Sequence, residues 1–169
     1  MPSGSPSGIE TAVYIASDNV CIGSLTLSDK IRPEIRQVVS SLGKSKAVLL
    51  SGDGEHAVEA AARQAGIAEW KAKCSPLEKK VFIEKLKEAG KIVCMVGDGI
   101  NDAPALTGAH VGISVVSATD MSIQVSDLLL TTKGLGALPD IRQLAVRGRK
   151  IVRQNMLWAF SFNIVGIGL

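Results

Sequence analysis

Two carboxylates, Asp98 and Asp102, lie four residues apart near the middle of the chain. Asp98 comes directly after the apolar run 92–96 (IVCMV), and both belong to the segment GDGINDAPAL. Two carboxylates this close repel each other unless a cation lies beside them. A hard divalent ion such as Mg²⁺ prefers oxygen ligands, and Asn101 adds a neutral oxygen. We therefore expect a magnesium site; the alternative is a strand-to-helix turn with Asp102 as the helix N-cap.

A second group of polar residues could bind phosphate. Ser51, Gly52 and Asp53 follow another apolar run and precede a helical pattern. A hydroxyl and unpaired backbone amides at the start of a helix suit an anion such as phosphate. Lys79 stands at the start of the next helical pattern, in PLEK, where an ammonium group could neutralise phosphoryl charge. The alternatives are structural roles, with Ser51 as an N-cap and Lys79 as an exposed helix lysine.

These groups can meet only if the fold brings the ends of their segments together. Short apolar runs alternate with helical patterns from residue 29 onward. This alternation predicts a parallel sheet covered by helices on both faces, with functional groups at the carboxyl ends of its strands. The expected strands are 47–50, 92–96, 111–115 and 127–130. The expected helices are 33–42, 55–65, 76–89 and 103–109.

The first part of the chain predicts a different element. Residues 12–16 and 21–27 are β-rich runs separated by Ser-Asp-Asn, which predicts a hairpin. Residues 1–8 (MPSGSPSG) predict a flexible tail and not a secretory signal. The three cysteines show no CxxC spacing, which argues against a zinc site, and Cys94 is expected to be a buried free thiol.

Composition limits the class of protein. The chain has 169 residues, 46% hydrophobic and 21% charged, so it is expected to form one domain of ordinary size and not to stay disordered. Only six side chains are aromatic, too few for a surface that stacks nucleic-acid bases. The net charge of +3 arises between Asp140 and Arg153, where five basic residues accompany one acid.

The end of the sequence is uncharged from residue 155 to residue 169. A basic segment followed by Trp158 and an apolar run is typical of a helix that enters a membrane from the cytoplasmic side. The apolar residues 156–169 would form a helix of about 21 Å, shorter than a hydrocarbon core of about 30 Å. We expect a truncated transmembrane helix with residues 1–154 cytoplasmic; the alternative is a core helix.

In their order and spacing, these motifs resemble the phosphorylation domain of the haloacid dehalogenase superfamily, and specifically that of P-type ATPases. GDGINDAPAL resembles the signature GDGxNDxPAL, SGD resembles TGD with Ser51 in place of threonine, and PLEK resembles P-x-x-K. DKIRP is similar to the D-x-x-R-P hinge beside the nucleotide-binding domain, which implies that Asp29 and Arg32 are hinge residues. The resemblance covers residues 9–169 and implies an α/β, haloacid dehalogenase-like parallel sheet with helices on both faces.

The resemblance also implies roles for single residues and an organisation for the chain. The implied catalytic residues are Ser51, Lys79, Asp98 and Asp102. The implied phosphate ligands are Ser51, Gly52, Asp53, Lys79 and Asn101, and the implied Mg²⁺ ligands are Asp98 and Asp102. The implied segments are a tail (1–8), the terminal hairpin of a nucleotide-binding domain (9–28), the phosphorylation domain (29–139), a basic juxtamembrane helix (140–154) and a truncated transmembrane helix (155–169).

One motif of the family is missing from the sequence. In P-type ATPases, ATP phosphorylates the aspartate of DKTGT, and no DKTGT occurs in these 169 residues. This implies a sheet without its nucleophile strand and a chain that alone neither forms a phosphoenzyme nor pumps. Two alternatives stay open. Asp29 could serve a soluble phosphatase, although Ile31 replaces the second acid that such an enzyme needs, or the chain could be a noncatalytic remnant that binds a full-length pump.

The spacing of the last segment points to the transported ion. Asn155, Phe162-Asn163 and Gly168 are similar in spacing to the Asn-x₆-Tyr-Asn-x₄-Pro pattern of copper-transporting members, with Phe162 and Gly168 as departures. The resemblance therefore implies Cu⁺ as transported ion, with Asn155, Phe162 and Asn163 on its path. It implies Mg²⁺ as cofactor and ATP as substrate. It also implies a membrane location, with lipid and the actuator, nucleotide-binding and membrane domains of a pump as partners, and no nucleic acid.

Overall fold

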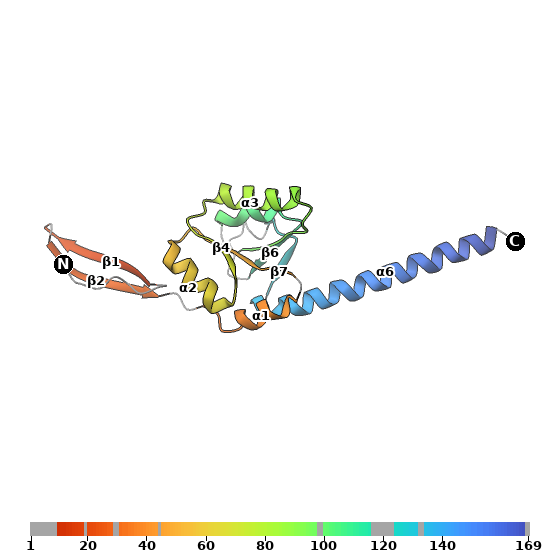
Figure 1. Cartoon of the computed structure of the whole chain (residues 1–169), viewed down its shortest axis with the longest axis horizontal. Helices are drawn as coiled ribbons and strands as arrows, with labels where there is room; N and C mark the ends of the chain where they lie inside the picture. The colour runs from red at the N-terminus through yellow and green to blue at the C-terminus, as the bar shows by residue number, and fades with distance from the viewer. Residues whose placement is uncertain are drawn as a thin grey trace. The chain divides into compact units, whose positions relative to one another are not determined.

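The computed structural model of the chain describes residues 10–18, 20–28, 31–43, 45–97, 100–115, 124–131 and 134–167. These residues belong to two compact units, 1–135 and 136–169. Figure 1 shows the elements in chain order. Three residues with predicted roles, Asp29, Asp98 and Gly168, lie outside the described residues.

The hairpin predicted at the start of the chain is confirmed. Strands β1 (Glu10–Ser17) and β2 (Val20–Ser28) pair antiparallel, from Glu10 opposite Ser28 to Ser17 opposite Val20. The turn between them includes Asp18 with a φ of 48°, a left-handed conformation that Asp tolerates better than most residues. The register shifts between Ile15 and Ala16, which is the mark of a β-bulge.

A first parallel pair of strands follows helix α1 (Ile35–Ser41). Strands β3 (Val48–Leu50) and β4 (Glu69–Lys71) pair with Val48 opposite Glu69, and helix α2 (Glu55–Ala65) connects them. The helix has the predicted bounds and ends at Gly66, whose φ of 73° is left-handed, so that the Ile67 amide reaches back to the Ala62 carbonyl. Strand β4 was not predicted, because three residues are too few to show a hydrophobic period.

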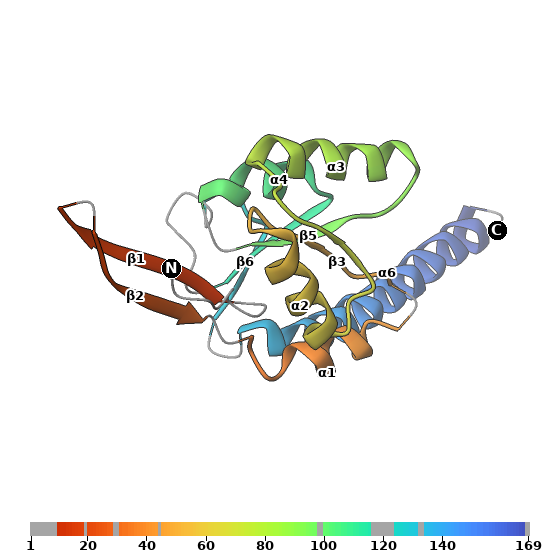
Figure 2. The ribbon, with the colours of Figure 1, turned by 60° about the vertical axis from the view of Figure 1, so that its left-hand side comes forward.

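A second parallel sheet has the order β5-β6-β7. Figure 2 shows α3 and α4 together on one side of the strands and α2 on the other, which is the predicted covering by helices. Among the described residues, no backbone ladder joins β3 to β5, so the predicted parallel sheet is present as two separate parts. The elements of this part are α3 (Pro76–Glu88), β5 (Cys94–Gly97), the 3₁₀ turn η1 (Ile100–Asp102), α4 (Ala103–Gly108), β6 (Val111–Val115) and β7 (Leu128–Leu130).

The hydrophobic core gathers around the central strand β6. Its residues Ile113 and Val115 are buried on one face and Ser114 on the other, so this strand is covered on both faces. Three helices contribute buried residues to the core: Val58, Ala62 and Ala65 from α2, Ile83 from α3, and Ala103, Ala105 and Leu106 from α4. The prediction that Cys94 is buried is wrong, because β5 pairs only with β6 among the described strands and Cys94 lies exposed on it.

The second unit is dominated by one helix, α6 (Leu138–Ile167), which begins after the 3₁₀ turn η2 (Gly134–Ala137). It runs without a break across the boundary predicted between residues 154 and 155. Within the part of the chain that the structure describes, no helix is both long and apolar enough to cross a membrane. The transmembrane interpretation of residues 155–169 therefore stays a prediction.

Candidate functional site

Two of the predicted site residues form a buried ion pair. The Lys79 Nζ atom, in the first turn of α3, lies 2.8 Å from Asp102 Oδ1, just before α4. Only 11% and 13% of these side chains are exposed, so water screens the pair little. Lys79 is therefore not an exposed helix lysine. Asp102 is the N-cap of α4, as in the alternative interpretation, although its side chain makes no capping hydrogen bond.

A capping box fixes the start of α3, which carries Lys79. The Ser75 hydroxyl and backbone amide donate to the Glu78 carboxylate at 2.7 and 2.8 Å, and the Glu78 amide donates to the Ser75 hydroxyl at 3.3 Å. These hydrogen bonds from Ser75 lower the pKa of Glu78. Pro76 at the first helical position completes this N-terminus. Lys79 therefore projects from a rigid helix end and not from a loop.

Asp102 is held against the end of β5 by a close approach to Gly97. A Cβ atom on Gly97 would lie 2.7 Å from the Asp102 Cβ, 2.8 Å from its Oδ2 and 2.9 Å from its Cγ. Only a residue without a side chain allows this approach. The glycine at the end of β5 thus sets the position of the carboxylate that pairs with Lys79.

We expect Gly97→Ala to lower the free energy of unfolding by about 1 to 3 kcal/mol, since the added methyl group forces Asp102 to move. The measurement is the midpoint of urea unfolding of the purified chain. Gly148→Ala is the control, because nothing lies within 4 Å of a Cβ at Gly148 and alanine in the interior of a helix should leave the free energy of unfolding unchanged or raise it by up to about 1 kcal/mol. Equal effects of the two substitutions would contradict the proposed close approach.

The Ser51-Gly52-Asp53 segment forms a fixed loop after β3. The Ser51 hydroxyl donates to Asp53 Oδ2 at 2.8 Å, and the Asp53 amide donates back to the Ser51 hydroxyl at 3.3 Å. Backbone hydrogen bonds tie this loop to the one that follows β4, from the Lys73 amide to the Asp53 carbonyl and from the Cys74 amide to the Ser51 carbonyl. The N-cap of α2 is Gly54, so the alternative role of Ser51 as an N-cap is excluded.

A cavity of about 400 Å³ lies between these segments. It brings together three of the predicted phosphate ligands, Gly52, Lys79 and Asn101, which come from three separate parts of the sequence. Three other predicted residues do not line the cavity but lie next to residues that do. Ser51 and Asp53 flank Gly52 in the sequence, and Asp102 pairs with Lys79. The other lining residues are Lys73, Cys74, Ser75 and Pro76, none of which was predicted as a site residue.

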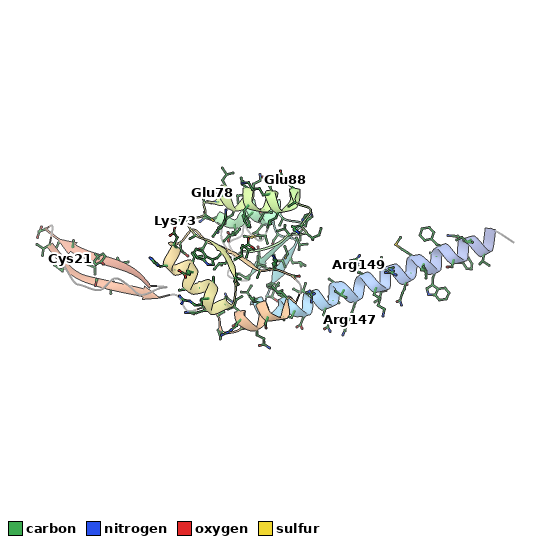
Figure 3. All side chains as sticks on the ribbon, viewed as in Figure 1. Cys21, Lys73, Glu78, Glu88, Arg147 and Arg149 are labelled. Atoms are coloured by element: carbon green, nitrogen blue, oxygen red, sulfur yellow. The ribbon has the colours of Figure 1, made fainter. Side chains whose placement is uncertain are left out.

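Lys73 is an unusual residue in the wall of this cavity. Its φ of 52° is left-handed, a conformation that costs energy in a residue other than glycine. Its ammonium group lies 3.3 Å from Glu55 Oε1, and about two thirds of both side chains are exposed, so the pair contributes little to stability. Figure 3 labels Lys73 and Glu78 near the N-terminal end of α3. No sequence pattern marks Lys73, whereas Ser75 belongs to the capping-box pattern S-x-x-E, which could have been read from the sequence.

The side-chain oxygens near the end of β5 are of the chemical type that binds Mg²⁺. One oxygen of Asp102 pairs with Lys79, and the other lies beside Gly97, the residue that precedes Asp98 in the chain. Carboxylate and amide oxygens are the hard ligands that Mg²⁺ prefers. Among the described residues there is no group of three or more His, Cys, Asp or Glu side chains around one point, and Asp98 lies outside those residues.

The remaining predicted residues do not line this cavity. Arg32 precedes α1, and its guanidinium would be 3.0 Å from a Cβ on Gly134, whose φ is 50°. Asn155, Phe162 and Asn163 all lie on α6 with exposed side chains. Asn155 and Phe162 are seven residues apart and so share one face of that helix, with Asn163 beside them.

A family model described as haloacid dehalogenase-like hydrolase matches residues 6–110. The chain is 36% identical over 160 residues to a cation-transporting P-type ATPase B of Mycobacterium bovis, which covers 94% of this chain and 21% of that protein. It is also 36% identical over 162 residues to a manganese-exporting P-type ATPase of Mycobacterium tuberculosis, which covers 94% of this chain and 23% of that protein.

The fold agrees with a solved structure of similar sequence. The crystal structure of a zinc-transporting PIB-type ATPase in the E2.Pi state matches with a TM-score of 0.80 and 34% sequence identity, over 92% of this chain and 26% of that one. The chain thus spans about a fifth to a quarter of the proteins that it matches.

Proposed function

Since this chain belongs to the haloacid dehalogenase-like hydrolase family, we propose that it is the phosphoryl-binding part of the catalytic domain of a heavy-metal cation-transporting P-type ATPase. The observation that carries the proposal is the buried pair of Lys79 and Asp102 beside a cavity lined by Gly52 and Asn101. Asp102 and Asn101 belong to GDGINDAPAL, and the named relatives are transporters of this kind. The parent is proposed to lie in a membrane, with lipid and its own further domains as partners.

The proposed chemistry uses these residues for binding and charge neutralisation. The Lys79 ammonium, held by Asp102 on a capped helix, faces the cavity and neutralises a phosphoryl oxygen. The Gly52 backbone and the Asn101 amide bind other oxygens of the same group. Asp98 and Asp102 would hold Mg²⁺, which neutralises charge on the transferred phosphoryl group when it is bound. Fixed positions and charges account for most of the catalysis in such transfers.

The nucleophile has to come from a segment outside these 169 residues, since they contain no DKTGT. We therefore propose that the chain by itself forms no phosphoenzyme from ATP. A soluble phosphatase that uses Asp29 is disfavoured, because Ile31 is a hydrocarbon side chain and cannot protonate a leaving group. Binding to a full-length pump without catalysis is the remaining alternative, and the phosphorylation experiment described below distinguishes it.

The transported ion is proposed at the level of a heavy-metal cation. The spacing of Asn155, Phe162 and Asn163 is similar to that of copper transporters, which favours Cu⁺. The relatives are named for cation transport, manganese export and zinc transport, which favours a divalent ion. To distinguish Cu⁺ from a divalent ion, the measurement is which of Cu⁺, Zn²⁺ and Mn²⁺ stimulates ATP hydrolysis by a pump that contains this segment.

The test is a chimeric pump in which this chain replaces the matching segment of the manganese-exporting relative. That chimera supplies the missing domains, so we expect it to form an acid-stable phosphoenzyme from radiolabelled ATP. Asp102→Asn should lower the initial rate of phosphoenzyme formation by about 100-fold or more, because it removes the carboxylate that holds the Lys79 ammonium in place and that would hold Mg²⁺. The purified chain alone should incorporate no phosphate.

A matched variant controls for the effect of any lost charge. Glu84 lies on the same helix as Lys79, pairs with Lys80 on the surface and is half exposed, so Glu84→Gln should leave phosphoenzyme formation within twofold. If Asp102→Asn and Glu84→Gln behave alike in a chimera that folds, the site assignment is wrong. If the chain alone is phosphorylated and loses this on Asp29→Asn, the phosphatase alternative is right.

A further inference from the structure

The cavity beside Lys79 has a second cation in its wall, which the proposed catalysis does not use. Among the described residues that line it, the two charged side chains are both lysines, Lys73 and Lys79. Lys79 has a buried counter-ion in Asp102, which offsets its charge inside the protein. A bound anion with more than one phosphate therefore depends on Lys73 for additional positive charge.

Lys73 has a partner that it can give up. Its ammonium group lies 3.3 Å from Oε1 of Glu55, which stands in the first turn of α2, and the two side chains are 69% and 66% exposed. An ion pair this exposed contributes little free energy, because water screens both charges. Glu55 does not line the cavity. A phosphate group in the cavity can therefore replace Glu55 as the partner of Lys73.

The backbone of Lys73 is fixed, although its side chain is exposed. Its amide donates to the Asp53 carbonyl at 2.9 Å, and the following amide, that of Cys74, donates to the Ser51 carbonyl at 2.8 Å. Its φ of 52° is left-handed, which a lysine adopts only at a cost in energy. The loop after β4 is thus held against the loop after β3, and this contact places Lys73 in the cavity wall.

The two lysines differ in their exposure to water. Only 11% of the Lys79 side chain is exposed, against 69% of the Lys73 side chain. Both line one cavity of about 400 Å³, so Lys79 lies toward its inner end and Lys73 toward its opening. Phosphoryl transfer from a nucleoside triphosphate needs positive charge at two successive phosphates, the one that is transferred and the one that leaves. One buried and one exposed cation suit such a chain of phosphates.

We propose that Lys73 binds the second phosphate of a di- or triphosphate whose terminal phosphate lies at Lys79. On binding, Lys73 exchanges the Glu55 carboxylate for a phosphate oxygen, and the cavity thereby prefers a diphosphate to a single phosphate. The inference rests on the proposed function and adds a specificity-determining residue to it. The opposing interpretation is that Lys73 only joins its loop to α2 through Glu55.

The experiment is a titration of the purified full chain with pyrophosphate and with inorganic phosphate, without Mg²⁺. The NMR shifts of the Gly52 and Asn101 amides report binding, because both residues line the cavity. Lys73→Met should weaken pyrophosphate binding about fivefold and phosphate binding less than about twofold, since only the longer anion reaches the exposed lysine. Glu55→Gln should strengthen pyrophosphate binding about threefold, because it removes the carboxylate that competes for Lys73.

Two further substitutions of Lys73 separate its charge from its backbone. Lys73→Arg keeps the cation and should leave pyrophosphate binding within about twofold. Lys73→Gly removes the cation, but glycine suits a left-handed φ. The midpoint of urea unfolding should therefore not fall in Lys73→Gly, while pyrophosphate binding weakens as much as in Lys73→Met.

The matched control is the pair of Lys80 and Glu84 on α3. These side chains are 43% and 48% exposed, they form an ion pair like that of Lys73 and Glu55, and they do not line the cavity. Lys80→Met and Glu84→Gln should each leave pyrophosphate binding within about 1.5-fold, because exposed charges away from the bound anion are screened.

Four results would overturn the inference: no shift of either amide with pyrophosphate, equal weakening by Lys73→Met and Lys80→Met, unchanged pyrophosphate binding in Lys73→Gly, or equal losses for phosphate and pyrophosphate. The last result would mean that Lys73 holds the loop and not a second phosphate. The titration contains no ATP and no nucleophile. A failure here therefore leaves the phosphoenzyme test of the proposed function standing, and a failure of that test leaves the titration standing.

Discussion

Lys79→Met is expected to lower the free energy of unfolding of this chain by about 3 to 5 kcal/mol, because it leaves the Asp102 carboxylate buried without its cation. Asp102→Asn should cost less, since the amide keeps one acceptor oxygen for the Lys79 ammonium group. The important quantity is the double variant. When both charges are removed, neither group is left buried and unpaired, so we expect the double variant to be more stable than Lys79→Met alone.

The measurement is a double-mutant cycle by urea unfolding, which isolates the coupling between the two side chains. The coupling should be about 2 kcal/mol or more for this pair. The matched control is the pair of Lys73 and Glu55, which are 69% and 66% exposed, and Lys73→Met with Glu55→Gln should show a coupling below about 1 kcal/mol. Additive effects at Lys79 and Asp102 would mean that the buried pair does not stabilise the fold.

Most elements of the fold could be predicted from the sequence because their hydrophobic pattern is local. Helix α2 and strand β6 have the predicted bounds, since one is bracketed by Gly54 and Gly66 and the other is a continuous apolar run. Strand β4 and the exposure of Cys94 could not be predicted. Strand β4 is only three residues long, Glu-Trp-Lys, and shows no hydrophobic period. The apolar run that holds Cys94 would look the same at the centre of a sheet and at its edge.

The candidate site shows the same division between local and long-range information. The motifs marked Lys79 and Asp102 separately, but their contact joins residues 23 apart and depends on how α3 packs against α4. The need for glycine at position 97 is visible only in the structure, where the Asp102 side chain occupies the space that a Cβ would fill. Lys73 lines the cavity because its loop is hydrogen-bonded to the loop that follows β3. The residues around Lys73 in the sequence do not predict this contact.

Strands β3 and β5 belong to separate parts of the parallel sheet, which suggests that a further strand can bind between them. Strand β3 pairs with β4 and β5 pairs with β6, and among the described strands neither has a partner on its other edge. In parallel pairing, alternate residues direct their backbone groups to opposite sides, so each of these strands presents unpaired groups at one edge. Such edges are templates for a further strand. In the P-type ATPases that the sequence resembles, the nucleophilic aspartate of DKTGT follows a strand. These 169 residues contain no DKTGT.

We therefore expect a synthetic peptide of an apolar strand followed by Asp-Lys-Thr-Gly-Thr to stabilise the chain. At a peptide concentration 100 times its dissociation constant, mass action predicts a gain of about 2.7 kcal/mol in the free energy of unfolding. Hydrogen exchange should slow at amides of β3 and β5 and not in the hairpin of β1 and β2, which is the internal control. A scrambled peptide of the same composition should have no effect.

Two altered peptides separate the fold from the chemistry. Replacing alternate strand residues of the peptide by proline removes backbone donors, so stabilisation should be lost if the peptide pairs as a strand. Replacing its aspartate by asparagine should keep the stabilisation but abolish phosphate transfer from acetyl phosphate, a donor that needs no nucleotide-binding domain. The intact peptide should accept phosphate only when Lys79 and Asp102 are both present, because those residues supply the charge at the cavity. If the proline peptide also stabilises the chain, the peptide does not pair as a strand between β3 and β5. That result would contradict the expected strand pairing but not the assignment of Lys79 and Asp102 to the site.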